Sequence, residues 1–225
     1  YSFNSYYNNS PSVNFSNVIA NPNIKPANRV SSEAGFDLRF LQNRIGIDFT
    51  YFVSDNGPLI YQLPVASSTG YSSQNVNGIT TRKKGIELSI TASPLKSTTG
   101  LNWDIAFNYS RYKETLKEIY GNESSLVINN HAYKVGDRMD AIYGRGFVYD
   151  GQGNKIFSGG LALAPPSDIN NLSFLGYANP DYNFGINNKF SYKNFTFSFQ
   201  LDGRIGGVIW DEVYKDGMNG GTAIE

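Results

Sequence analysis

Apolar and polar side chains alternate without interruption over residues 195–204, FTFSFQLDGR. Neighbouring side chains of a β-strand point to opposite faces, so Phe195, Phe197 and Phe199 share one face and their polar neighbours share the other. Similar alternation predicts further strands near residues 36–40, 45–53, 86–92, 101–110 and 182–192, with the remnant of another near residues 2–8. The pattern therefore predicts about seven strands and no convincing amphipathic helix.

The connections between the predicted strands alternate in length. Short turns occupy residues 41–44, 94–100 and 193–194, whereas long polar segments occupy about 9–32, 54–78, 116–180 and 207 onward. In an up-and-down meander, every second connection lies at the same end of the sheet. Outer-membrane β-barrels show this asymmetry, with short periplasmic turns and longer extracellular loops. The longest segment should contain hairpins of its own, and residues 146–157 are one candidate because Asp150-Gly151 and Gly153-Asn154 are turn formers.

The two faces of the predicted strands differ in charge. The polar faces carry Asp37, Arg39, Asp48, Glu87, Asp104, Lys189, Asp202 and Arg204. The apolar faces carry no charge, and Asn188 and Gly203 are their mildest breaks. A lipid-facing surface must exclude charge, because a Lys or Arg at the midplane costs roughly 2–4 kcal/mol. Burial inside a soluble sandwich would gain a similar amount, roughly 1.5–3 kcal/mol per large side chain, so alternation alone leaves both folds open.

Aromatic placement and strand length favour lipid over a second protein layer. Trp103 and Tyr192 lie near the short turns, and Tyr51 and Tyr109 lie toward the long loops, as in the aromatic girdles of membrane proteins. Strands of about 10–15 residues exceed the usual 5–6 of soluble sheets. They suit a tilted crossing of the hydrocarbon core, which needs about 9–11 residues.

Composition narrows the possible functions. The formal net charge is zero and the sequence shows no basic cluster, so nucleic acid is not an expected partner. The absence of cysteine excludes a disulfide scaffold, and His131, the one histidine, is expected at a loop surface rather than in a metal site. No nucleophile motif, spaced carboxylate pair or phosphate loop is apparent, so we expect neither an enzyme nor a cofactor. The opening residues are neither a signal peptide nor a translation start, which indicates that the chain begins within something larger.

Four segments, in order, resemble the SusC/RagA-like branch of the TonB-dependent outer-membrane transporters. They are RVSSEAGFDLRFLQNRIGIDFTYF (29–52), NVNGITTRKKGIELSI (75–90), VGDRMDAIYGRGFVYDGQGNKIF (135–157) and LGYANPDYNFGINNKFSYKNFTFSFQLDGRIGG (175–207). The resemblance covers most of the chain. It implies an all-β fold, an antiparallel up-and-down meander that forms a segment of a transmembrane 22-stranded β-barrel with long extracellular loops. The family's plug, coupling box, early strands and final strand have no counterpart here, so residues 1–225 are expected to be a C-terminal portion of the barrel.

The resemblance also implies a function and partners. The expected function is active import of oligosaccharides or oligopeptides across the bacterial outer membrane. The expected partners are a SusD-like surface lipoprotein, the TonB energy-coupling complex acting through the absent N-terminal region, and outer-membrane lipid. Two alternatives remain open at this point, a soluble or cell-surface β-sandwich that binds carbohydrate and a siderophore receptor barrel.

Two groups of residues are candidates for functional contacts. Loop aromatic residues stack on sugars and acidic residues accept their hydroxyls, so ligand or lid contacts are assigned to Tyr61, Tyr71, Tyr120, Trp210, Asp211 and Glu212. The lumen wall is assigned to Asp37, Arg39, Glu87, Asp104, Asp202 and Arg204. Simpler interpretations are that the loop residues pack loops together, and that Glu87 pairs with a neighbouring lumen base.

Overall fold

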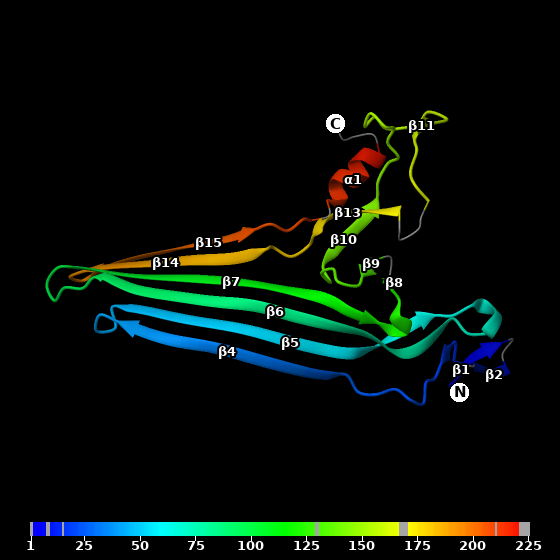
Figure 1. Cartoon of the computed structure of the whole chain (residues 1–225), viewed down its shortest axis with the longest axis horizontal. Helices are drawn as coiled ribbons and strands as arrows, with labels where there is room; N and C mark the ends of the chain where they lie inside the picture. The colour runs from blue at the N-terminus through cyan, green and yellow to red at the C-terminus, as the bar shows by residue number, and fades with distance from the viewer. Residues whose placement is uncertain are drawn as a thin grey trace.

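The computed structural model describes residues 2–7, 10–14, 16–128, 131–166, 171–209 and 211–220 (Figure 1). Its main feature is a seven-stranded sheet with the order β15-β14-β7-β6-β5-β4, in which the short strand β3 (Val18–Ile19) pairs in parallel with β6. The long strands are β4 (Asn28–Phe40), β5 (Ile45–Pro64), β6 (Ser73–Leu95), β7 (Leu101–Ile119), β14 (Tyr182–Tyr192) and β15 (Phe195–Ile205). All their pairings are antiparallel. The expected meander is confirmed.

The short turns gather at one end of this sheet, as predicted. Residues 41–44, 96–100 and 193–194 connect the long strands at the left of Figure 1, and the longer connections lie at the right. The first turn places three consecutive residues in the left-handed region, Leu41, Gln42 and Asn43, with φ of 50°, 56° and 63°. Their backbone strain is offset by hydrogen bonds from Arg44 N to the carbonyl oxygens of Phe40 and Leu41.

The prediction of a polar loop over residues 54–78 is wrong. Strand β5 continues to Pro64 and β6 begins at Ser73, so only residues 65–72 connect them. Strand β7 likewise continues to Ile119, although alternation in the sequence fades after residue 110. The β5–β6 register shifts between Asn56 and Leu59, a bulge that disturbs the period-2 pattern. The strands continue beyond the alternating part of their sequence. In the loop-end half both faces contact water and loops, so one uniformly apolar face is not required.

The smaller elements depart from prediction at both ends of the chain. The first strand, β1 (Ser2–Tyr7), pairs with β2 (Ser10–Asn14) in a separate hairpin rather than extending the main sheet. The long third loop contains the strand pairs β8 (Ser125–Ile128) with β9 (His131–Lys134), β10 (Ala141–Arg145) with β13 (Leu172–Tyr177), and β11 (Phe157–Ser158) with β12 (Leu161–Ala162). A helix that the sequence pattern missed, α1 (Glu212–Asn219), follows β15.

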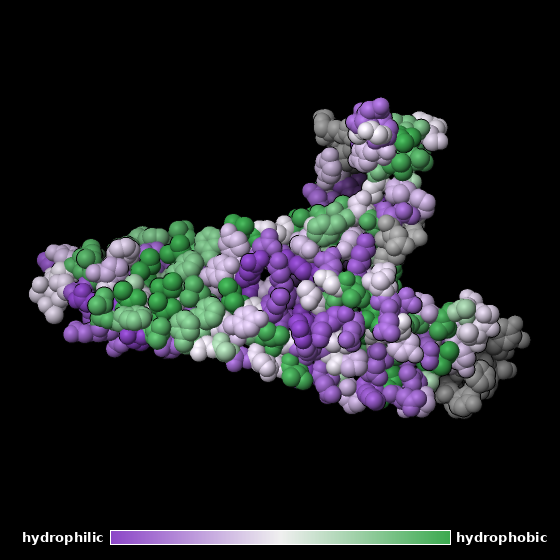
Figure 2. Space-filling model, in the orientation of Figure 1, coloured by the Kyte–Doolittle hydropathy of each residue, from purple (hydrophilic) through white to green (hydrophobic). Residues whose placement is uncertain are grey.

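The apolar face of the main sheet is uncovered among the described residues. Phe195, Phe197 and Leu201 are 81%, 65% and 57% exposed, values that a two-layer sandwich would not permit for its inner face. Figure 2 shows this hydrophobic surface spread over the turn-proximal half of the sheet. The single layer rules out the sandwich alternative for this chain. No described helix combines the length and the apolar character needed to cross a membrane.

The apolar face is organised in cross-strand rows. Leu201, Ile186, Phe107, Ile90, Ile47 and Leu38 form its middle row. Trp103 stacks on Phe190 near the short turns, with ring centroids 5.5 Å apart, and Tyr109 meets Tyr182 at the same distance toward the loops. This row order places apolar side chains between two aromatic borders, the arrangement of a membrane-spanning wall.

Asn188 interrupts the apolar face and is satisfied within it. Its side-chain oxygen accepts a hydrogen bond of 3.1 Å from the indole Nε1 of Trp103, and Asn188 is only 7% exposed. An unpaired amide facing hydrocarbon would be costly. The pair thus explains how the strand tolerates a polar residue at this position.

The buried core of the described residues lies at the loop end of the sheet. Ile79, Leu116 and Ile119 are at most 5% exposed, and half-buried Leu126, Tyr133 and Met139 pack against them. These partners come from the β8–β9 pair and the segment after it. Among the described residues, the sheet therefore has a buried protein core only where the loops fold onto it. The apolar face of the turn-proximal half must be covered by something outside these residues.

Candidate functional site

The polar face of the sheet carries the candidate site. Its residues follow from strand register, because every second side chain of each strand points to this side. One row joins Asp37, Asp48, Ser89, Asn108, Gly185 and Asp202, and the next joins Gly35, Thr50, Glu87, Ser110, Asn183 and Arg204. The rows run across the whole wall, so residues far apart in the sequence become neighbours.

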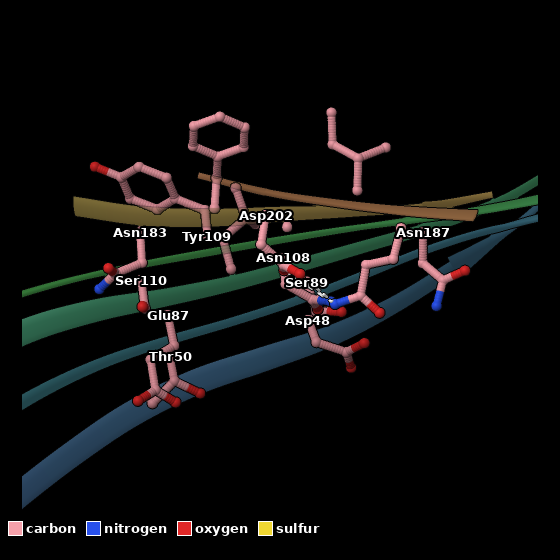
Figure 3. A pocket seen from close by; sticks show the side chains of 15 residues that line it. Asp48, Thr50, Glu87, Ser89, Asn108, Tyr109, Ser110, Asn183, Asn187 and Asp202 are labelled. Atoms are coloured by element: carbon pink, nitrogen blue, oxygen red, sulfur yellow. Dashed lines mark hydrogen bonds between the residues drawn. The ribbon is translucent and has the colours of Figure 1, made fainter. Parts of the chain in front are cut away.

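A shallow pocket of about 470 Å³ lies on this face. Its polar lining includes Asp48, Thr50, Glu87, Ser89, Asn108, Ser110, Asn183, Asn187, Gln200 and Asp202. Figure 3 shows the side chains of Asp48, Glu87 and Asn183 extending to one side of the strands and the Tyr109 ring to the other. Amides, hydroxyls and carboxylates dominate the surface, so it offers hydrogen bonds to a polar partner or to water.

The electrostatic balance of the pocket is acidic. The guanidinium of Arg39 contacts Asp37 and lies 3.3 Å from Asp48 Oδ1, whereas Asp202 accepts hydrogen bonds of 3.0 and 2.8 Å from the neutral Gln200 amide. The predicted base beside Glu87 is not found, because Glu87 makes no ion pair with any described residue. The lining of this pocket therefore holds the carboxylates of Asp48, Glu87 and Asp202 and no basic side chain, whereas Arg204 lies on the same face outside it.

The remaining predicted wall residues lie on the same face. Asp104 accepts a 2.6 Å hydrogen bond from Ser93 Oγ and borders a second pocket of about 210 Å³ together with Lys189. Arg204 borders a third, of about 810 Å³, with Asp202. The structure thus brings Asp37, Arg39, Glu87, Asp104, Asp202 and Arg204 to one surface. The last four line three neighbouring pockets, and Asp37 and Arg39 line none of them, so the six do not form one binding site.

The predicted ligand or lid contacts do not converge. Tyr61 is half-buried and packs against the Ile79–Leu116 core, and this burial raises its pKa. Tyr71 and Tyr120 are 42% and 53% exposed near the loop ends of β6 and β7. Tyr71 and Tyr120 are therefore the ones accessible to an external partner.

The acidic pair after β15 has a local structural role. Asp211 Oδ1 accepts a 2.8 Å hydrogen bond from Tyr214 N at the start of α1, the geometry of an N-cap, and Glu212 forms an ion pair with Lys215. Trp210 lies outside the described residues. Figure 1 shows α1 apart from the tips of β5, β6 and β7, so these residues do not form one site with the loop tyrosines.

A buried arginine that sequence reasoning missed fixes the third loop. Arg138 is 6% exposed and donates hydrogen bonds of 2.8 and 2.7 Å to Asp140 and one of 3.1 Å to Asp181. Its guanidinium carbon also lies 4.0 Å from the centroid of the Tyr177 ring. The sequence DRMD (137–140) contains an indication of this contact, because an arginine with two nearby aspartates can be buried with its charge paired. We call Arg138, Asp140 and Asp181 the loop anchor.

The loop anchor ties the third loop to the wall. Asp181 directly precedes β14, and its backbone nitrogen donates to Ile205 O of β15 at 2.8 Å. Burial raises the pKa of Asp140, but hydrogen bonds from Arg138 and from Asn179 N outweigh that effect and lower it. Asp140 is therefore ionised at neutral pH, as its partner requires.

The candidate hairpin within residues 146–157 is confirmed as a turn. Tyr149 and Lys155 form a β-bridge, and Asp150 Oδ1 accepts hydrogen bonds from Gln152 N and Asn154 N at 2.9 and 2.8 Å. Gly153 adopts φ of +88°, which its missing Cβ permits. The acidic side chain is thus used by its own turn and not by a ligand.

A second buried contact beside the loop anchor yields a pH prediction. The Tyr143 hydroxyl donates to Asp137, and burial together with this bond raises the pKa of Tyr143 to about 12. A raised pKa means that the folded loop holds the proton more tightly than the open loop. The contact's stabilisation is therefore complete below the ordinary pKa of 10 and is lost between about pH 10 and 12. Subtracting the ultraviolet tyrosine titration of Tyr143→Phe from that of the unmodified protein should reveal a group titrating near 12, and a midpoint near 10 would contradict the assignment.

No cluster that could hold a metal ion is found among the described residues. Their histidine and acidic side chains do not gather into a group of three that could hold an ion. His131 is exposed at the start of β9, as predicted.

Comparisons with known proteins agree with the geometry. The family model described as TonB dependent receptor-like, beta-barrel matches residues 1–217. The chain is 27% identical over 221 residues to the TonB-dependent receptor SusC of Bacteroides thetaiotaomicron, covering 90% of this chain and 22% of that protein. It is 25% identical over 217 residues to the TonB-dependent receptor P3 of Formosa agariphila, covering 84% and 21%. The chain thus spans about a fifth of the length of these relatives.

Solved structures share the fold. The RagAB peptide importer in its open-open state superposes with a TM-score of 0.72 at 12% identity, covering 92% of this chain and 23% of that one. The structure of the RagAB peptide transporter gives 0.71 at 13% identity, covering 91% and 24%. One uncovered apolar face, one polar face and the matched family model lead to a single assignment. The chain belongs to the TonB-dependent receptor-like β-barrel family, resembles its SusC and RagA members, and forms part of a barrel wall in the bacterial outer membrane.

Proposed function

We propose that residues 1–225 are a C-terminal portion of a TonB-dependent transporter that imports oligosaccharides or oligopeptides across the outer membrane. The observation that carries the proposal is the pairing of a polar face, with an acidic pocket on it, and an uncovered apolar face in the same strands. In a closed barrel the polar face lines the lumen, where it borders cargo or a plug. The family is one of receptors and transporters, and the proposal assigns the chain no enzymatic step.

The loop end supplies the surface for capture. Its exposed tyrosines, Tyr71 and Tyr120, suit stacking on a sugar ring or contact with a lid protein. The similarity to the RagAB peptide transporter supports peptides as one cargo class. A SusD-like lipoprotein over the loops and coupling to TonB through a region outside this chain complete the proposed system. No described feature favours a siderophore over these cargoes.

Uptake by cells that carry the intact receptor tests the proposal. Labelled oligosaccharide and oligopeptide pools are offered to cells with the receptor, without it, and with it but lacking TonB. We expect one pool to accumulate only when both receptor and TonB are present, because transport against a gradient needs the coupling. Equal accumulation of a pool without TonB would contradict the assignment. So would a receptor that accumulates an iron–siderophore complex but neither of the two pools.

A further inference from the structure

A group of basic side chains lies on the outward face directly beyond the apolar rows. Lys84 and Lys113 are opposite each other in the β6–β7 register, and Arg111, two residues before Lys113, lies on the same face. Arg111 is opposite Ile86, whose other neighbour is Tyr51 at the edge of the apolar face. We call Lys84, Arg111 and Lys113 the outer basic cluster. Figure 2 shows a strongly hydrophilic band crossing the middle of the sheet beside the hydrophobic half.

These three bases have no acidic partner among the described residues. The carboxylate on this face, Asp55, is already held by Arg82 at 2.6 Å and by Lys117 at 3.5 Å. Both carboxylate oxygens of Asp55 accept hydrogen bonds of 2.6 Å from the Arg82 guanidinium, so this carboxylate already has its partners. The five bases Lys84, Arg111, Lys113, Arg82 and Lys117 outnumber the acids Asp55 and Glu118 on this part of the outward face, so positive charge is in local excess.

The arrangement is unfavourable without an anion. Like charges directly opposite each other on one face of a sheet destabilise the pairing, and Lys84 and Lys113 occupy such positions. The cluster lies on the loop side of the apolar rows. Two residues along a strand span about 7 Å, so each member is one or two such steps beyond the last apolar side chain of its strand. Long loops mark the extracellular side, so the cluster is at the headgroup level of the outer leaflet.

We propose that the outer basic cluster binds the phosphate groups of a lipid in the outer leaflet. Charge complementarity selects a phosphorylated headgroup, and the adjoining rows offer the acyl chains an apolar surface. Two ammonium groups and a guanidinium on neighbouring strands can share several phosphate oxygens. The proposal rests on the barrel orientation used for the proposed function, but it concerns the outside of the wall and not the cargo route.

Lipid binding by the intact receptor tests the proposal. The protein is titrated with phosphatidylcholine vesicles containing diphosphorylated lipid A and with vesicles of phosphatidylcholine alone. We expect preference for the phosphorylated lipid, and about tenfold weaker binding or more in the variant K84Q/R111Q/K113Q, since each surface base contributes to anionic-lipid affinity. The variant K83Q/K189Q/R204Q is the matched control, because it removes the same charge from the polar face.

Three results would overturn the assignment of a phospholipid site to the outer basic cluster. The first is equal affinity for the two vesicle types, and the second is an equal loss of affinity in the control variant. The third is displacement by millimolar inorganic phosphate alone, because it would identify a site for free phosphate. The single variant K84Q removes the Lys84–Lys113 repulsion and should fold, so unchanged lipid binding in both K84Q and R111Q would also contradict the proposal. Because cargo uptake is not measured, failure here is distinguishable from failure of the import proposal.

Discussion

Replacing Ile186 with lysine should destabilise the intact barrel by about 2–4 kcal/mol, the cost of a cation at the lipid midplane. Ile186 belongs to the middle apolar row, between Leu201 and Phe107. The same replacement at the next residue, Asn187→Lys, should change stability little, because Asn187 is exposed on the polar face opposite Gln200. The two variants add the same side chain to the same strand and differ only in the face it occupies.

Urea unfolding of both variants in lipid vesicles measures this difference. The free energy of unfolding should fall for Ile186→Lys and remain within about 1 kcal/mol of the parent for Asn187→Lys. Ile186→Val is the control for packing and should cost about 0.5–1.5 kcal/mol or less. Equal destabilisation by the two lysines would contradict the assignment of the faces.

Replacing Arg138 with methionine should release the third loop from the wall. Removing one partner of a buried ion pair costs about 3–5 kcal/mol, because it leaves an uncompensated charge. The lower end of that range applies here, since the Arg138 side chain is 5% exposed but the Asp181 side chain is 50% exposed and partly screened. The loss should be local, because the loop anchor joins the loop to β14 and does not touch the apolar rows.

Hydrogen exchange of the backbone amides in β10 and β13 measures the release. Protection of Ala141–Arg145 and Leu172–Tyr177 should fall by about a hundredfold, while protection in β6 and β7 stays unchanged. Arg145→Met is the matched control, because among the described residues the exposed Arg145 guanidinium donates hydrogen bonds to the Pro165 carbonyl oxygen alone. Unchanged protection in Arg138→Met would show that the loop anchor is not what holds the loop.

The wall was predictable because a membrane imposes a strict pattern on it. The hydrocarbon excludes charge from one face, so the alternation around Phe107 and Ile186 marks strand, face and register together. The turns at residues 41–44 and 193–194 were equally clear, since they interrupt this alternation abruptly. The wall residues assigned from sequence share the polar face for the same reason.

The parts beyond the membrane were less predictable because no such constraint acts there. Strand β5 continues through Asp55 to Pro64, and its side chains there contact water, loops or neighbouring side chains. Because this part of the sequence is polar and does not alternate, it resembles a loop. The loop anchor and the outer basic cluster both depend on pairings between segments, which periodicity does not report. The sequence holds a run of three bases, Arg82-Lys83-Lys84, but only the β6–β7 register shows that Lys84 lies opposite Lys113.

The orientation of the two faces supports every proposal above and can be measured directly. Residues 1–225 contain no cysteine, so single cysteines at positions 183 to 190 of β14 can each carry a spin label in a vesicle-embedded receptor whose cysteines outside this chain are replaced. The account predicts a strict period of two, with labels at 184, 186 and 190 relaxed by oxygen dissolved in lipid and labels at 183, 185, 187 and 189 relaxed by a water-soluble nickel complex. A uniform profile along the strand, or the opposite phase, would contradict it.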